Sequence, residues 1–282
     1  MPLLPRPAVR QLTHRDRDEA LDLCARDPAS HVFVASRIVD GDLDRGGPLV
    51  GVRDGAGRLT SLCWTGANIV PVETDEAARH LLADRLRRRS HQTASILGRA
   101  PEALDLWRRL EPHWPTPRSV RAAQLLLALD APPSVRGIEP DPRVRPAVPS
   151  EVPIVRPAAV DMFTGEIGYP PYTGSDRAYT ALLADLVSRG RTYVVVEDGR
   201  VIFKADVGSV ALGCAQVQGV WLAPELRGAG RSVGLMAAVC EQVARDHAPL
   251  VTLYVNEYNH PARALYARLG FRLVGPYATI LM

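Results

Sequence analysis

Residues 220–232 read VWLAPELRGAGRS and carry the most informative local pattern of the chain. It begins as an apolar strand end, passes through a turn that contains Gly228 and Gly230, and leads into an amphipathic helix from Ser232. Free N–H groups at a helix start, together with the positive end of the helix dipole, form a site for an anion. The glycines let the backbone approach such an anion, and either can take a positive φ. The sequence therefore predicts a turn that binds a pyrophosphate.

Two arginines flank the glycines of this turn. Arg227 and Arg231 add positive charge beside the predicted anion site, with solvated surface charges as the alternative interpretation. Their position at a helix start favours contact with phosphate. The apolar residues that follow have helical spacing, so the helix is expected to begin where the glycines end: Val233, Met236, Val239, Cys240, Val243 and Ala244.

A dinucleotide-binding fold is an alternative interpretation of the same turn. Gly228-Ala229-Gly230 followed by Gly234 approximates the G-x-G fingerprint of such domains. In those domains the strand runs almost directly into the first glycine, whereas residues 223–227 intervene here. Too little chain follows to build the remainder of such a domain, so this alternative is the less favoured one.

A second block lies further along the chain. Residues 250–255, LVTLYV, form a short run rich in β-branched and apolar residues, and a helix is expected over residues 261–269. Proline at the start of this helix and Gly270 just past its end are typical boundary signals. The block therefore predicts a strand followed by a helix, with Asn259 between them.

Both blocks resemble motifs of the GCN5-related N-acetyltransferase family. Residues 227–232, R-G-A-G-R-S, resemble motif A, which reads Arg or Gln, two residues, Gly, one residue, Gly or Ala; Gly230 takes the first glycine position, and Ser232 stands where Gly or Ala is usual. The second block resembles the family segment N-x-x-A-x-x-L-Y-x-x-x-G-F through Asn259, Ala262, Leu265, Tyr266, Gly270 and Phe271. The resemblance covers about residues 142–282.

The resemblance implies acetyl-coenzyme A as co-substrate and assigns roles to particular residues. The backbone of Val220, Trp221 and Leu222 would pair with the pantetheine arm. Asn259 would contact the cofactor, and Tyr266 would lie near its sulfur as proton donor to the leaving thiolate. The pyrophosphate would be held by the turn, which consists of Arg227, Gly228, Ala229, Gly230, Arg231 and Ser232.

Simpler interpretations stand beside these roles. Asn259 is an equally good helix cap without any ligand. Tyr266, beside Leu265 and near Leu269, is also compatible with a half-buried core aromatic. Cys214 lies in an apolar strand and is expected to be an inert core residue, because direct attack by an amine on a thioester needs no covalent enzyme intermediate.

The general base is less evident. Many members of the family carry a glutamate on the strand before motif A, but residues 214–222 contain no acid. Gln216 and Gln218 on this strand are expected to position a water, since an amide does not accept a proton at neutral pH. The candidates for a base acting through water are Asp161, Glu166 and Glu257.

The chain is long enough for two domains. Its 282 residues are 46% hydrophobic, an ordinary globular composition. We expect an N-terminal domain over residues 1–130, a proline-rich linker over residues 131–142 and a catalytic domain over residues 143–282. The predicted fold class is α/β, with a mixed, mostly antiparallel sheet flanked by helices as in the acetyltransferase fold.

The catalytic domain is expected to follow the order β-α-β-β-β-α-β-α-β. Strands at residues 193–197 and 201–204 are joined by a hairpin turn at Asp198-Gly199, and a further turn is expected at Gly208-Ser209. A helix is expected over residues 179–187. The segment 164–174, rich in Gly, Pro and Tyr, lies where the family places a lid over the acceptor.

The N-terminal half is interpreted as a degenerate copy of the same fold. Residues 103–110 align with residues 262–269, and Trp107 stands where the second copy has Tyr266. Its expected elements are a strand over 8–12, a helix over 18–26, a hairpin over 49–70 around Asp54-Gly55 and a helix over 75–89. Acidic residues, not glycines, precede the last of these helices and would repel a pyrophosphate. This copy is therefore expected to serve packing, acceptor recognition or regulation without binding the cofactor.

Composition argues against several other classes. The net charge is only +3, and the triplet at residues 87–89 is interpreted as a solvated helix end, so neither a nucleic-acid partner nor a membrane is expected. Four cysteines without metal-ligand spacing, and no apolar core after residues 1–5, predict a reduced, cytoplasmic protein without a metal. Lys204 is the only lysine among 34 basic residues, which leaves almost none for self-acetylation.

Taken together, the sequence predicts an acetyl-coenzyme A-dependent N-acetyltransferase. The acceptor is expected to be a small-molecule or peptide amine, which no motif specifies further. A non-catalytic acyl-coenzyme A sensor or interaction protein is the alternative: the missing strand acid favours it, whereas Tyr266 favours catalysis.

Overall fold

The computed structural model describes residues 8–282, so the expectation about residues 1–5 lies outside the described range. The chain forms two compact units. The first contains residues up to Leu127, Tyr254–Asn259 and Leu273–Met282; the second contains Ala128–Leu253 and His260–Arg272. Within residues 8–282, no helix combines the length and the apolar character needed to cross a bilayer.

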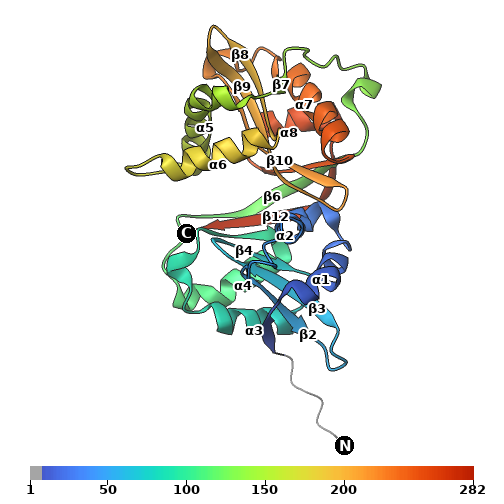
Figure 1. The fold of residues 1–282 in the computed structure, drawn as a ribbon, viewed down its shortest axis with the longest axis vertical. Helices are drawn as coiled ribbons and strands as arrows, with labels where there is room; N and C mark the ends of the chain where they lie inside the picture. Colours follow the sequence, from blue (N-terminus) through green and yellow to red (C-terminus); the bar gives the residue numbers. More distant parts are fainter. Residues whose placement is uncertain (1–7) are drawn as a thin grey trace, which may run out of the picture. The chain divides into compact units, whose positions relative to one another are not determined.

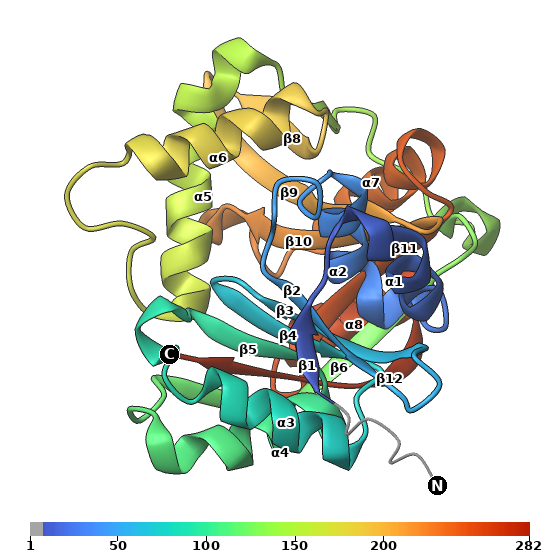
Figure 2. The same ribbon diagram turned by 60° about the horizontal axis from the view of Figure 1, so that its bottom comes forward.

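The first unit is a mixed sheet with helices on both faces (Figure 2). Its strands follow the order β1-β2-β3-β4-β5-β12-β6. Helices α3 and α4 pack their apolar sides on one face, where Leu82, Leu106 and Trp107 are buried. The elements are β1 (Val9–Gln11), α1 (Arg17–Cys24), α2 (Pro28–Val39), β2 (Leu49–Arg53), β3 (Leu59–Thr65), β4 (Asn68–Val72), α3 (Glu76–Leu86), β5 (Ser95–Arg99), α4 (Ala100–Leu110), β6 (Ser119–Leu129) and β12 (Arg272–Leu281).

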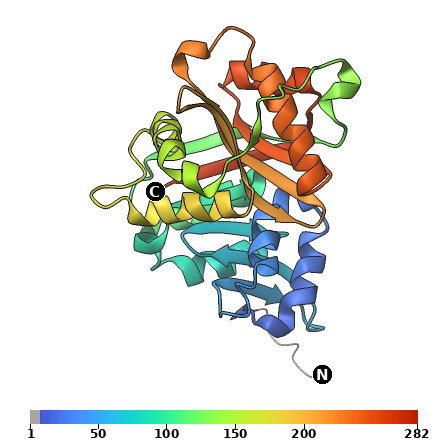
Figure 3. The ribbon, with the colours of Figure 1, turned by 45° about the horizontal axis from the view of Figure 1, so that its top comes forward.

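The second unit repeats this plan (Figure 1). Its strands follow the order β11-β10-β9-β8-β7. Helices α7 and α8, orange to red, lie on the opposite face of the sheet from α5 and α6 (Figure 3). The elements are β7 (Arg145–Pro146), α5 (Val152–Ile167), α6 (Arg177–Ser188), β8 (Thr192–Glu197), β9 (Arg200–Ala211), β10 (Cys214–Leu222), α7 (Ser232–Asp246), β11 (Leu250–Asn256) and α8 (His260–Leu269).

The last strand of the chain belongs to the first unit. β12 pairs antiparallel with β5, with Tyr277 opposite Arg99 and Leu281 opposite Ser95. This register buries Ala278 and Ile280 in the core of the first unit and covers an edge that β5 would otherwise expose. The compact units therefore interleave along the chain, whereas the sequence predicts contiguous domains at 1–130 and 143–282.

The segment expected to be a linker is ordered by α7. A short 3-10 helix occupies Pro133–Arg136, and the backbone N–H of Ser134 donates to Glu241 Oε1 at 3.0 Å. The N–H of Asp141 donates to the carbonyl of Gly234 at 2.9 Å. A Cβ on Gly234 would lie 3.2 Å from the carbonyl oxygen of Glu139, so the glycine permits this close approach. The segment predicted as a linker, residues 131–142, therefore contacts α7 at several points.

One of the two hairpin turns predicted for the second unit is present in the structure. Asp198 and Gly199 both have positive φ, 49° and 72°, which confirms the turn between β8 and β9. The turn expected at Gly208-Ser209 is wrong: β9 runs on to Ala211, and the chain turns at Leu212-Gly213. Gly208 instead lies at a register shift, where Gln216 pairs with Ser209 and Val217 with Val207.

Candidate active site

The turn between β10 and α7 contains two glycines in the left-handed region. Gly228 and Gly230 have φ of 79° and 73°, a region that residues with a Cβ rarely adopt. No heavy atom lies within 4 Å of a Cβ built on either glycine. The turn residues from Arg227 to Arg231 are exposed. The loop is therefore open to a ligand, and its glycines are required by conformation.

The first turn of α7 carries no side-chain cap. Arg231 occupies the N-cap position without a side-chain hydrogen bond to the helix, and no acidic residue lies in the first turn. Arg227 stabilises the approach to the turn, because its Nε donates to the carbonyl of Leu222 at 2.9 Å. The positive end of the α7 dipole and its N–H groups thus face the exposed loop without a carboxylate to neutralise them.

β10 is paired differently along its two edges. Its parallel pairing with β11 runs over three residues and ends at Gln216 opposite Thr252. On the other edge β9 continues to pair, with Trp221 opposite Lys204 and Leu222 opposite Phe203. The backbone of Val220–Leu222 therefore lies beyond the end of the β11 pairing. Along this edge of β10, an extended ligand could form the hydrogen bonds that β11 does not make.

A hollow lies beside the end of β10. Its volume is about 520 Å³, and its walls come from α5, the β8–β9 turn and the chain after β10. Most of the lining is apolar, including Pro157 and Trp221. Trp221 Nε1 donates to Asp161 Oδ2 at 2.7 Å, so this carboxylate is already engaged.

Tyr266 is a buried residue of α8. Its side chain is 7% exposed, and its ring lies 5.5 Å from that of Phe271. Burial raises the pKa of the phenol well above its ordinary value, and the neighbouring Cys240 and Glu166 add to the rise. Burial thus favours the protonated phenol.

The three candidate bases differ in their surroundings. Glu166 is exposed at the end of α5, and its charge acts on Tyr266. Asp161 accepts the indole N–H of Trp221. Glu257 lies in the first unit, where its backbone N–H donates to the carbonyl of Ala123 at 3.0 Å. Of the three, Glu166 is the one whose charge is felt at Tyr266.

Asn259 lies directly before α8. It is exposed, and its backbone N–H donates to the carbonyl of Asn256 at 2.9 Å. It belongs to the first compact unit. Its contact with a cofactor stays a prediction, and helix capping remains the alternative.

A buried charge pair that was not predicted from the sequence lies next to β10. Lys204 is fully buried on β9, and its Nζ donates to Asp206 Oδ2 at 2.5 Å and to the carbonyl of Gly219 at 3.0 Å. Thr192 Oγ1 donates to the other oxygen, Asp206 Oδ1, at 3.0 Å. The sequence contains a signal for this pair, because Lys204 and Asp206 are two residues apart on a strand and therefore share one face.

The cysteines are free and buried. Burial raises the pKa of the Cys24 thiol to about 12 and those of Cys63 and Cys240 further still. Cys214 lies in the core of β10. None of them has the exposed, electropositive setting of a nucleophilic thiol.

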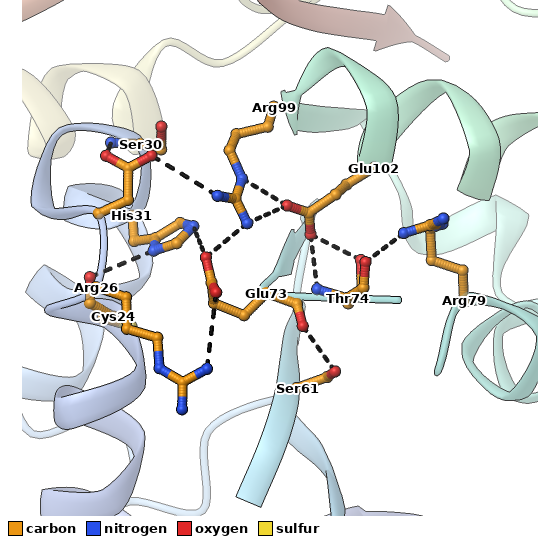
Figure 4. Close-up of polar contacts among 11 residues, drawn as sticks. Cys24, Arg26, Ser30, His31, Ser61, Glu73, Thr74, Arg79, Arg99 and Glu102 are labelled. Carbon is orange, nitrogen blue, oxygen red and sulfur yellow. Dashed lines mark hydrogen bonds and ion pairs between the residues drawn. The ribbon is translucent and has the colours of Figure 1, made fainter. Parts of the chain in front are cut away.

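The equivalent position in the first unit is occupied by carboxylates (Figure 4). β4 and β5 also pair in parallel over a short stretch, ending at Ile69 opposite Ile96. Glu73 follows β4 with a positive φ of 52°, and its Oε1 accepts from Arg99 Nη2 at 2.6 Å. Glu102 accepts from the backbone N–H and the hydroxyl of Thr74 at 2.9 and 2.7 Å. These contacts tie the chain after β4 to the end of β5 and the start of α4.

Comparison with known proteins agrees with this architecture. Residues 160–271 match the model of the acetyltransferase (GNAT) family, and residues 47–155 match a domain of unknown function, DUF4081. None of the curated proteins matches the sequence. The match to the GNAT family is thus to residues 160–271, less than half of the chain.

Solved structures extend the fold to both units. A GCN5-related N-acetyltransferase from Sphaerobacter thermophilus has a TM-score of 0.60 at 18% identity, over 99% of this chain and 96% of that chain. A tandem GNAT protein from the clavulanic acid biosynthesis pathway has a TM-score of 0.57 at 18% identity, over 97% and 98%. At these identities the likeness shows the fold alone, and it confirms the predicted acetyltransferase architecture. Family and fold together support a function of the N-acetyltransferase type.

Proposed function

We propose that the chain transfers an acetyl group from acetyl-coenzyme A to an amine by direct attack. The observation that carries this proposal is the contrast between two helix starts. α7 begins after an exposed turn with two glycines at positive φ and has no side-chain cap. α3 begins with Asp75, whose carboxylate caps it. One site per chain therefore suits a pyrophosphate, and it lies in the second unit.

The residues around this site would have distinct roles. The backbone of Val220, Trp221 and Leu222 would pair with the pantetheine arm, and the residues 227–232 with Asn259 would contact the remainder of the coenzyme. Tyr266 would donate its proton to the leaving thiolate as the amine nitrogen bonds to the acetyl carbon and the carbon–sulfur bond breaks. Glu166 would accept the proton of the amine through water. Asp161 is less suited because it accepts the indole N–H of Trp221, and Glu257 lies in the first unit.

The first unit would not bind the coenzyme. Glu73, Glu102 and Asp75 lie around the chain that follows β4, where the second unit has its glycine turn. Three carboxylates at this position would repel a pyrophosphate. We assign this unit to packing, acceptor recognition or regulation, with the catalytic domain following at residues 143–282.

Release of free thiol from acetyl-coenzyme A tests the proposal. The protein would be incubated with acetyl-coenzyme A and a panel of small primary amines and peptides with free N-termini, with a thiol reagent as readout. Thiol release that depends on an amine supports catalysis. Binding of acetyl-coenzyme A without release for any amine in the panel would favour the alternative, a non-catalytic acyl-coenzyme A sensor.

A further inference from the structure

The only lysine of the chain lies where β10 departs from regular pairing. Gln218 pairs with Asp206 on β9 and Trp221 pairs with Lys204, so Gly219 and Val220 together oppose Ala205. This is a β-bulge, and it immediately precedes the backbone segment 220–222. Any group that fixes the bulge also fixes which N–H and C=O groups of that segment face outward from the edge of β10.

Lys204 makes such a contact. Its Nζ donates to the carbonyl of Gly219 at 3.0 Å, which removes that carbonyl from ordinary ladder pairing. Gly219 has a positive φ of 59°. A Cβ at this position would lie 2.9 Å from Asp206 Oδ2 and 3.2 Å from Lys204 Nζ. The ion pair and the glycine therefore fit together, and a residue with a side chain would displace the pair.

The pair is difficult to explain by stability alone. Lys204 is 0% and Asp206 is 4% exposed, and lysine is almost never fully buried unless it is paired. Replacing a buried ion pair by apolar residues is often neutral or stabilising, because two charges no longer have to be desolvated. Asp206 already accepts from Lys204 and Thr192, so it is an anchor for the ammonium and poorly suited as a proton acceptor.

We infer that Lys204, held by Asp206 and Thr192, is a positioning residue that locks the β10 bulge so that the backbone of residues 220–222 is set to pair with the pantetheine arm of acetyl-coenzyme A. The inference rests on the proposed function and adds how the backbone of residues 220–222 is positioned for the coenzyme. It predicts that the charge pair matters for the pantetheine part of the coenzyme and not for the pyrophosphate part.

Calorimetry with two ligands separates these parts. The double variant Lys204→Met with Asp206→Asn removes both charges together and so leaves neither one buried and unpaired. It is expected to bind acetyl-coenzyme A about tenfold more weakly, the scale of a lost hydrogen bond to a charged group. Its affinity for 3′-phospho-ADP, which ends at the pyrophosphate, is expected to stay within about twofold of the wild type, since that ligand does not reach the bulge.

A second charge pair provides the matched control. Arg79 Nε lies 2.6 Å from Asp105 Oδ2 in the first unit, and both side chains are 15% exposed. The double variant Arg79→Met with Asp105→Asn is expected to bind both ligands like the wild type. Equal binding of acetyl-coenzyme A by the folded Lys204/Asp206 variant and the wild type would overturn the inference. If the wild type itself does not bind acetyl-coenzyme A, the proposed function fails instead.

If the Lys204/Asp206 double variant does not fold, a spectroscopic measurement on the wild-type protein tests the same inference. Because Lys204 is the only lysine, selective ¹⁵N-lysine labelling gives a single side-chain ammonium resonance. We expect acetyl-coenzyme A to shift this resonance and 3′-phospho-ADP to leave it in place. A resonance that is unchanged at saturating acetyl-coenzyme A would contradict the positioning role.

Discussion

The carboxylate of Asp75 accepts a hydrogen bond from the backbone N–H of Ala78 at 2.7 Å and thereby caps α3. No side chain does this for α7, the corresponding helix of the second unit. A capped N-terminus has satisfied one of its free N–H groups and carries a negative charge, whereas an uncapped one retains its affinity for anions. The two copies of the fold therefore differ at the helix start where the proposed function places the pyrophosphate.

Removal of the α3 cap should cost stability without affecting ligand binding. Asp75→Ala is expected to lower the free energy of unfolding by about 1 kcal/mol, the usual contribution of an N-cap side chain. Acetyl-coenzyme A binding should be unchanged. Asp84→Ala, an exposed position on the same helix, is the control and should cost less than about 0.5 kcal/mol. Urea unfolding and calorimetry give the two readouts; a weaker ligand affinity in Asp75→Ala would contradict the assignment of the first unit.

Tyr266→Phe tests the proton donor. The variant should lower kcat by about 100-fold and change the KM for acetyl-coenzyme A little, because general acid catalysis acts in the transition state. Tyr193→Phe is the matched control, since the buried Tyr193 hydroxyl has no hydrogen-bond partner in the described part of the chain. It should retain activity and stability. Steady-state kinetics give kcat and KM for both variants. Full turnover by Tyr266→Phe would remove Tyr266 from the mechanism.

Glu166 and Asp161 should respond differently to neutralisation. Glu166→Gln is expected to lower kcat by about 100-fold at neutral pH, and the loss should shrink as rising pH deprotonates the amine without help. Asp161→Asn should stay near the wild type, since Asp161 accepts the indole N–H of Trp221. Rate measurements between pH 6 and 10 distinguish them. An equal rate for Glu166→Gln and the wild type at every pH would exclude Glu166 as the base.

His31 makes the stability of the first unit depend on pH. Its side chain is 2% exposed, and burial lowers the pKa of the ring below its ordinary 6.5; the charge of Arg99 lowers it further, whereas Asp27 and Glu73 oppose the shift. Nδ1 lies 3.3 Å from the carbonyl of Cys24, and Nε2, which has no hydrogen-bond partner among residues 8–282, lies 3.7 Å from Glu73 Oε1. Below pH 6.5 the unfolded chain therefore binds a proton that the folded unit does not take up.

Stability should accordingly fall as the pH drops below 6.5, with a slope of up to about 1.4 kcal/mol per pH unit from this residue. His31→Gln removes the titrating group and should show a shallower loss than the wild type in urea unfolding at pH 7.5, 6.5 and 5.5. A loss of the same steepness in both proteins would show that the dependence has another origin.

Local chemistry made much of the second unit predictable. Gly228 and Gly230 indicate positive φ, because a residue without a Cβ adopts this region readily. Asp198-Gly199 between two apolar runs predicts a hairpin. Gly208 was misassigned because glycine within a strand signals a bulge as readily as a turn. Helix α2 was missed, although Asp27 followed by Pro28 is a helix-start signal and the Asp27 carboxylate accepts from the N–H of Ser30.

Contacts between distant segments could not be predicted from the sequence. The pairing of β12 with β5 joins segments almost 180 residues apart and leaves no local pattern. The burial of Lys204 depends on the bulge of β10, whose position is set by register and not by composition. The tie between Glu73 and Arg99 likewise requires the parallel alignment of β4 and β5.

Calorimetric titration of acetyl-coenzyme A, with the wild type compared with Gly230→Glu, tests whether the turn before α7 binds the coenzyme. The glutamate places an L-residue at a φ of 73° and a negative charge beside the proposed phosphate site. Gly137→Glu makes the same change at a φ of 70°, also with open space around its Cβ, at the end of a short 3-10 helix.

We expect one acetyl-coenzyme A per wild-type chain, binding at least about 100-fold weaker in Gly230→Glu, and nearly unchanged binding in Gly137→Glu. Two sites per chain, or equal binding by Gly230→Glu and the wild type, would contradict this expectation.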